Sequence, residues 1–137
     1  MNVLITLPKK RITAIVEGRK TIIFKKTFPR RFSTRTDVVL ICESGTNLVV
    51  AWFKVATFQY ESDPVVVWDL YKNKLCVPFL WFMTYARGYR PYYLWHVESA
   101  GYLPRPFLRD ATFELSENPR DFAYTERNFV VFPTILD

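Results

Sequence analysis

The spacing of apolar and polar residues divides the chain into short strands and helices. Residues 1–7 form an apolar, strand-like opening, and Pro8 then begins a segment whose apolar positions recur at helical spacing. These positions are Ile12, Ile15 and Val16. Gly18 follows, and a glycine at this place supplies the left-handed residue that ends many helices. The pattern therefore predicts a strand, a short amphipathic helix and a sharp turn at Gly18.

A strand of mixed character is predicted after this turn. In residues 20–28 both alternating sets of side chains mix apolar residues with lysine, so a strand there has no purely apolar face. The strand ends at a proline, and residues 29–35 form a basic loop. The apolar pattern predicts two further strands, at residues 38–43 and 48–58, which are joined as a hairpin through the turn at 44–47.

Two helices and one more strand are predicted in the middle of the chain. Asp63 followed by Pro64 is a typical N-cap and first helical residue. Pro78 begins a second helix, which is predicted to end at Gly88. Residues 92–98 then predict the next strand.

The net charge of +6 is unevenly distributed along the chain. Residues 1–36 hold ten cations and one acid, which is +9, whereas residues 37–137 hold nine cations and twelve acids, which is −3. A surface shaped only by solubility would intersperse the two signs. Basic residues gathered beside a helix end often bind an anion, and nucleic acid is the commonest macromolecular one. A solvated basic face without a ligand is the alternative.

The turn and the strand after it resemble the signature of the ASCH superfamily, small proteins allied to the PUA domain of RNA-modifying enzymes. The family motif is Gly-x-Lys-x-x-Glu-x-Arg, and this chain reads Gly18-Arg-Lys20-Thr-Ile-Ile23-Phe-Lys25. Gly18 and Lys20 match the motif. Lys25 keeps the charge of the motif arginine without its planar fork, and Ile23 replaces the acid.

The resemblance extends in element order over residues 3–108 and implies the fold. It implies an α+β protein with a PUA-like open β-barrel, a mixed sheet of about five to six strands and about two to three short helices covering the barrel openings. We expect residues 1–108 to form this barrel. Residues 109–137, which include a late apolar strand at 129–132, are expected to form a C-terminal extension packed on the same domain.

The expected function is recognition of single-stranded RNA through a basic cleft next to the first helix and the strand after it. Tyrosines interleaved with arginines around Pro91 suit single-stranded RNA, whose exposed bases stack on rings and guanidinium planes. The residues expected to contact RNA are Arg19, Lys20, Lys25, Lys26, Arg30, Arg31, Lys9, Lys10, Arg87, Tyr89, Arg90 and Tyr92.

Two other functions remain open. Some proteins of the resembled family are amidohydrolases acting on acetylated cytidine, and others are ribonucleases; in the amidohydrolases a lysine matching Lys20 acts with a threonine three residues later and a glutamate in the following helical region. This chain has Ile23 at the threonine position and only Asp69 within residues 64–75, so a non-enzymatic protein is favoured and no catalytic residue is assigned. The third possibility is a protein-protein interaction module that self-associates or binds a partner through the aromatic C-terminal extension.

The remaining reactive side chains predict structure rather than chemistry. Cys42 and Cys76 lie in apolar contexts without paired spacing, which predicts buried thiols in a reducing compartment. His96 is expected to be hydrogen-bonded within a strand, and the four tryptophans are expected in the core. We expect no metal, no cofactor and, because no apolar run is long enough to span a bilayer, no membrane. The expected location is cytoplasmic, in a host cell if the protein is viral.

Overall fold

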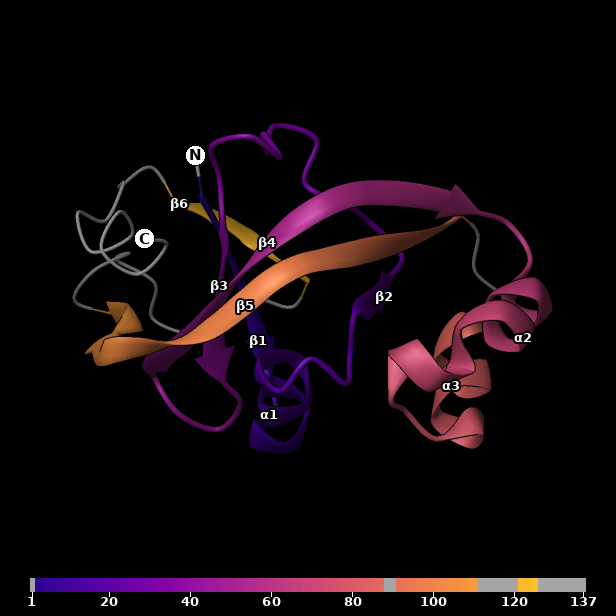
Figure 1. Cartoon of the computed structure of the whole chain (residues 1–137), viewed down its shortest axis with the longest axis horizontal. Coiled ribbons are helices and arrows are strands. Elements are labelled where there is room, and N and C mark those ends of the chain that lie inside the picture. The colour runs from indigo at the N-terminus through magenta and orange to yellow at the C-terminus, as the bar shows by residue number, and fades with distance from the viewer. Residues whose placement is uncertain (1, 88–90, 111–120, 126–137) are drawn as a thin grey trace.

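Six strands and three helices make up the part of the chain that the structure describes. The structure is a computed structural model, and it describes residues 2–87, 91–110 and 121–125. In chain order the elements are β1 (Asn2–Leu7), α1 (Lys9–Val16), β2 (Ile22–Lys25), β3 (Val39–Glu43), β4 (Leu48–Glu61), α2 (Pro64–Leu75), α3 (Phe79–Ala86), β5 (Tyr92–Leu108) and β6 (Ala123–Thr125) (Figure 1).

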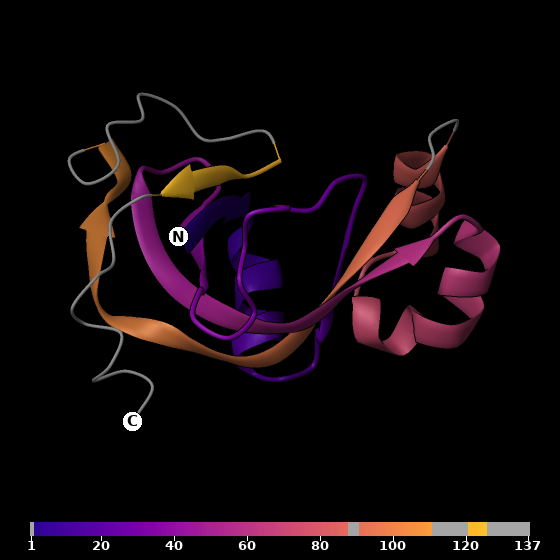
Figure 2. The same ribbon diagram turned by 90° about the horizontal axis from the view of Figure 1, so that it is seen from above.

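All six strands belong to one mixed sheet, in the order β2-β5-β4-β3-β1-β6. The β1–β3 pair is parallel, and the other pairs are antiparallel. The central strands β4 and β5 are long and strongly bent, and register shifts along their ladder allow this bending (Figures 1 and 2). The α+β class and the mixed sheet expected from the sequence are therefore confirmed.

The first helix and its turn form as the sequence predicts, with a shift of one residue at the start. Pro8 is the N-cap rather than the first helical residue. Gly18 has a φ of 81°, and the backbone N–H groups of Arg19 and Lys20 both donate to the carbonyl of Ala14 at 3.0 Å. The turn satisfies the last carbonyls of α1 and places Lys20 directly beside the helix end.

Strand β2 is shorter than predicted, and the residue before it, Thr21, bonds both to a helix and, through its carbonyl, to Val97 of β5 at 2.8 Å. The ladder between β2 and β5 runs only from Ile22 opposite His96 to Lys25 opposite Tyr93. Before it, the backbone N–H of Thr21 donates to the carbonyl of Lys74 near the end of α2, at 3.0 Å. Residues 20–21 are thus tied to α2.

Strand β5 is longer than predicted, because its prolines do not end it. Tyr102 lies opposite Ala51 and Phe107 lies opposite Val49, so four residues of β5 face one residue of β4. Pro104 falls inside this irregular stretch, where a missing N–H removes no regular ladder bond.

Alternation along the strands distributes the core over both faces of the sheet. On β1, Val3 and Ile5 join a cluster with Ile12 of α1, while Leu4 joins a second cluster with Trp52 on the opposite face. A third cluster packs α2 and α3 against β2 and β5. Its buried members are Ile22, Phe24, Val67, Leu75, Phe82, Ala86, Tyr92 and Leu94.

Helices α2 and α3 lie together at one end of the molecule, away from β6 (Figures 1 and 2). The Asp63 side chain accepts a hydrogen bond from the backbone N–H of Val65 at 2.9 Å, as its predicted N-cap role requires. Helix α3 ends before Arg87. The predicted cap Gly88 and the predicted strand at 129–132 lie outside the described residues.

One of the two cysteine predictions is wrong. Cys42 is buried, but Cys76, which ends α2 in a left-handed conformation with a φ of 52°, is exposed. Its thiol donates to the carbonyl of Arg19 at 3.3 Å. The hydrogen-bonded histidine is confirmed, since His96 Nε2 lies 2.8 Å from Gln59 Oε1.

Candidate functional site

A small cavity of about 110 Å³, here called the inner cavity, lies where α1, β2, α3 and the C-terminal end of α2 meet. Its lining residues are Thr6, Leu7, Pro8, Arg11, Lys20, Ile23, Phe24, Lys25, Leu75, Val77, Trp81 and Tyr85. Three of these are cations, and none is an aspartate or a glutamate. The described wall therefore carries a positive charge without a carboxylate.

Lys20 is the least exposed residue of the three cations. Only 4% of the residue is exposed, and Nζ donates to the carbonyl of Leu75, the last residue of α2. That carbonyl lies at the negative end of the helix dipole. Burial, followed by the nearby charge of Arg11, lowers the pKa of Lys20 to about 8.

Burial also disfavours the charged forms of the other two cations of the inner cavity. Burial lowers the pKa of Arg11 and of Lys25, and Arg11 adds to the lowering at Lys25. Lys25 Nζ donates to the backbone carbonyl of Asp121 at 3.3 Å, and the charge of Asp121 partly opposes the lowering. Arg11, Lys20 and Lys25 thus repel one another across a small space.

Aromatic rings complete one side of the inner cavity. Trp81 and Tyr85 of α3 stack with their ring centroids 5.2 Å apart and their planes 5° apart. The guanidinium of Arg11 lies 4.0 Å from the centroid of the Trp81 ring, and Lys26 Nζ lies 4.8 Å from that of Tyr85. Each ring of the stacked pair thus contacts one cation, and these contacts help to hold the side chains of Arg11 and Lys26 in place.

Thr6 of β1 also lines the inner cavity. Its Oγ1 atom is buried and has no hydrogen-bond partner within the described ranges. A buried hydroxyl without a partner costs free energy, and a ligand or water can supply the missing bond.

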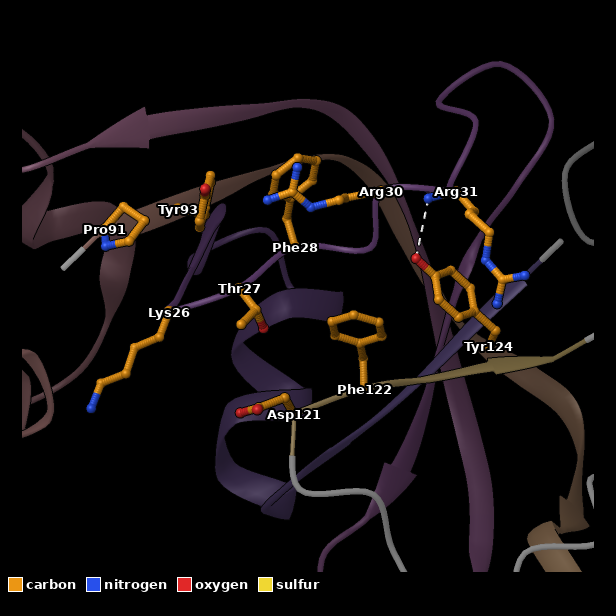
Figure 3. Close-up of a pocket in the computed structure, with 10 residues that line it drawn as sticks. All are labelled: Lys26, Thr27, Phe28, Arg30, Arg31, Pro91, Tyr93, Asp121, Phe122 and Tyr124. Atoms are coloured by element: carbon orange, nitrogen blue, oxygen red, sulfur yellow. Dashed lines mark hydrogen bonds between the residues drawn. The ribbon is translucent and has the colours of Figure 1, made fainter. Parts of the chain in front are cut away.

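A larger pocket of about 860 Å³, here called the outer pocket, opens between the basic loop after β2 and the segment that contains β6 (Figure 3). It is lined by Lys26, Thr27, Phe28, Arg30, Arg31, Pro91, Tyr93, Asp121, Phe122 and Tyr124. Three cations and four aromatic rings share this wall with one acid, Asp121.

Rings position the arginines of the outer pocket. Arg31 lies 4.1 Å from the ring centroid of Tyr124, whose hydroxyl accepts a hydrogen bond from the backbone N–H of Arg31 at 3.1 Å (Figure 3). The guanidinium of Arg30 lies 5.3 Å from the ring centroid of Phe28. Thr27 resembles Thr6, because its Oγ1 is buried without a partner among the described residues.

The two cavities are neighbours. Lys25 lines the inner cavity and the next residue, Lys26, lines the outer pocket while its ammonium lies over Tyr85 of the inner cavity. Lys25 in turn bonds to Asp121 of the outer pocket. A ligand that fills the outer pocket therefore lies close to the inner cavity.

The backbone matches crystal structures of ASCH from Zymomonas mobilis. That protein matches with a TM-score of 0.77 and 17% identity over 92% of this chain and 88% of its own. Two point mutants of it match with TM-scores of 0.78 and 0.77, at 16% identity, over 92% of this chain and 89% and 91% of theirs. This chain has the ASCH fold. At such identity the likeness establishes the fold alone, and the sequence matches no protein-family model and no curated protein.

Within the ASCH fold, the structure brings five of the expected residues together. Lys20 and Lys25 line the inner cavity, and Lys26, Arg30 and Arg31 line the outer pocket. Contact with RNA by these residues stays a prediction.

The other expected residues lie elsewhere. Arg19 pairs with Glu17 at 2.6 Å, and it lines neither cavity. Lys9, Lys10 and Arg87 are exposed and also line neither cavity. Tyr89 and Arg90 lie outside the described residues.

Tyr92 needs a correction, because its ring cannot serve as a stacking surface for a base. Only 2% of Tyr92 is exposed, and its ring stacks on Phe24 with centroids 5.2 Å apart. Its hydroxyl donates to the carbonyl of Ala86. The neighbouring Tyr93, on the opposite face of β5, lines the outer pocket instead.

Sequence reasoning missed several lining residues. Arg11 carried a signal, because a cation in the first turn of a helix opposes the dipole and is poorly placed for stability. Phe122 and Tyr124 carried none, because they reach the outer pocket only through the pairing of β6 with β1. Trp81, expected in the core, packs against the third core cluster and also lines the inner cavity.

Neither a metal-binding cluster nor a membrane-spanning helix occurs among the described residues. No three His, Cys, Asp or Glu side chains gather there in a way that would hold a metal ion. None of the described helices is long and apolar enough to span a membrane.

Proposed function

We propose that this protein binds single-stranded RNA along the face formed by the inner cavity and the outer pocket. The observation that carries the proposal is the arrangement of cations and rings, since each cavity holds three cations and the two cavities adjoin. Arginine and lysine neutralise phosphates, and aromatic rings stack on unpaired bases. The resemblance to proteins allied to RNA-modifying enzymes agrees with this ligand.

A single strand suits this face better than a duplex does. Recognition of single-stranded RNA relies on bases that are free to stack on rings or guanidinium groups, and a duplex hides these surfaces. Tyr93, Phe28 and Phe122 line the outer pocket, whose volume of about 860 Å³ is within the range of pockets that hold small ligands, about 300–1,000 Å³.

Equilibrium binding of a labelled oligonucleotide tests the proposal. We expect the single strand to bind more tightly than a duplex of the same sequence at low salt. The double substitution Arg30→Glu/Arg31→Glu is expected to weaken binding at least tenfold, which corresponds to about 1.4 kcal/mol.

The matched control for this test is Arg35→Glu/Arg105→Glu, which changes the net charge equally at exposed positions outside both cavities. Both variants are expected to keep their melting temperature, because surface substitutions usually change stability by about 0.5 kcal/mol or less. Equal weakening in both would show that only the net charge matters. No binding by the unmodified protein at low salt would refute the proposal.

One observation favours a second candidate, a hydrolase of the kind the ASCH resemblance implies. A lysine with a pKa of about 8 is partly neutral near that pH, and a neutral amine can accept a proton or attack a carbonyl. The described wall of the inner cavity supplies no carboxylate to assist it, and Asp69 lines a different, apolar depression on α2 and α3. Turnover of acetylcytidine or labelled RNA that disappears in Lys20→Ala would establish the enzyme.

A further inference from the structure

We infer that the inner cavity binds the terminal phosphate monoester of an RNA strand, so that the protein recognises a phosphorylated end. The inference rests on the proposed function and names the part of the RNA that the inner cavity takes. The outer pocket would then hold the nucleotide next to that phosphate.

Charge is the first reason. Arg11, Lys20 and Lys25 converge on one small space whose described wall holds no carboxylate. Burial lowers the pKa of all three groups, and the neighbouring cations lower the pKa of Lys20 and Lys25 further, although Asp121 partly opposes the lowering at Lys25. An anion in the cavity would remove the repulsion and make their protonated forms favourable. A neutral base in the same place would leave the penalty unchanged.

The number of charges and oxygens favours a monoester over an internal phosphodiester. A phosphate monoester carries about −1.5 to −2 charges at neutral pH and presents three acceptor oxygens. A diester carries a single charge. Three cationic donors around the inner cavity, joined by the hydroxyl of Thr6 after rotation of its side chain, match the monoester.

Size and access agree with this choice. A water occupies about 30 Å³ in the liquid, so a cavity of about 110 Å³ accommodates a group the size of a phosphate. An internal phosphate has a nucleotide on each side, so the RNA strand would have to enter the cavity and leave it again. A terminal phosphate enters end-on from the adjoining outer pocket, beside Lys25 and Lys26.

Three oligonucleotides of one sequence test the inference: one with a 5′-phosphate, one with a 3′-phosphate and one with hydroxyl groups at both ends. Their affinities for the full chain are measured at one salt concentration. We expect one phosphorylated form to bind at least tenfold more tightly than the hydroxyl form. Arg11→Gln and Lys20→Met should abolish this preference.

Arg30→Gln is the matched control, since Arg30 lines only the outer pocket. It should weaken all three oligonucleotides by the same factor and keep the preference. Melting temperatures of all variants are measured beside the affinities. Because Lys20→Met removes a buried hydrogen bond and could reduce folding, Arg11→Gln, at a partly exposed position, decides the outcome if Lys20→Met is unfolded.

The outcomes separate the inference from the proposed function. Equal binding of all three oligonucleotides would overturn the inference and leave RNA binding intact. No binding of any oligonucleotide would overturn both. A nucleoside monophosphate that binds as tightly as the phosphorylated RNA would overturn end recognition in favour of a free nucleotide.

The pH profile gives a further readout. The preference for the phosphorylated end should decline as pH rises above about 8, where Lys20 loses its proton, and as it falls below about 6, where the phosphate gains one. The groups that act on Lys20 are Arg11, Lys25, Cys76 and the carbonyl of Leu75. A preference that does not vary over this range would contradict the part assigned to Lys20.

Discussion

The charged form of Lys20 is stabilised by a carbonyl group and destabilised by burial and by neighbouring cations. The carbonyl of Leu75 accepts its hydrogen bond at the C-terminus of α2, where the helix dipole favours a cation. Burial and the charges of Arg11 and Lys25 oppose the protonated form more strongly, so the net effect is a lower pKa. The folded protein therefore holds this proton less tightly than the unfolded chain does.

This difference predicts that stability rises with pH in the alkaline range. Between the folded pKa of Lys20, about 8, and its ordinary value of 10.5, the unfolded chain binds more protons, so the free energy of unfolding increases with pH. The full effect of this shift is on the order of 3 kcal/mol. Urea unfolding at several pH values should show the increase, and Lys20→Met should reduce it. Lys25 has a pKa lowered in the same direction, so a smaller increase should remain. Identical pH profiles for the two proteins would exclude Lys20 as its source.

The family motif indicated Lys20 as a functional position, but it did not indicate how the side chain would be held. A lysine just after a helix is expected to lie near the end of that helix. Here the backbone N–H of Lys20 caps α1 and the side chain reaches the end of α2 instead. The contact depends on the docking of α2 against β2, which no local sequence signal describes.

Two left-handed residues position the segment that carries Lys20. Gly18 ends α1 with a φ of 81°, and Cys76 ends α2 with a φ of 52°. The first turn could be predicted, because glycine after an amphipathic helix is a strong signal. The second could not, because cysteine seldom adopts this conformation and gave no reason to expect a cap.

The backbone at Cys76 predicts an order of stability for its variants. Glycine adopts a left-handed conformation without the clash that a Cβ atom causes, and a β-branched residue tolerates it worst. We expect Cys76→Gly to be more stable than Cys76→Ala by about 0.5–1 kcal/mol, and Cys76→Val to be less stable than both. Chemical denaturation of the three variants measures the order. Equal stability of the glycine and valine variants would contradict a left-handed residue at this position.

At the scale of the whole molecule, the sheet brings distant segments together around the outer pocket. The basic loop after β2 supplies its cations, and β5 supplies Tyr93. Phe122 comes from the segment leading into β6, and Tyr124 comes from β6 itself. The excess of cations in residues 1–36 predicted that one face would be basic. The aromatic wall opposite could not be predicted, because the antiparallel pairing of the short β6 with β1 alone sets its place.

The salt dependence of RNA binding measures how many phosphates the cations of this face contact. If about five of the cations lining the two cavities meet phosphates, the logarithm of the binding constant should fall with the logarithm of salt concentration with a slope of roughly −3.5 for a single strand. Raising salt from about 50 to about 200 mM would then weaken binding roughly a hundredfold. Arg30→Glu/Arg31→Glu should flatten the slope by roughly 1.4, because two phosphate contacts are lost. Arg35→Glu/Arg105→Glu should leave the slope unchanged, since neither side chain lines a cavity. A slope shallower than about −1.4 in the unmodified protein would mean that fewer than about two phosphates are bound, and that the cations of this face act separately.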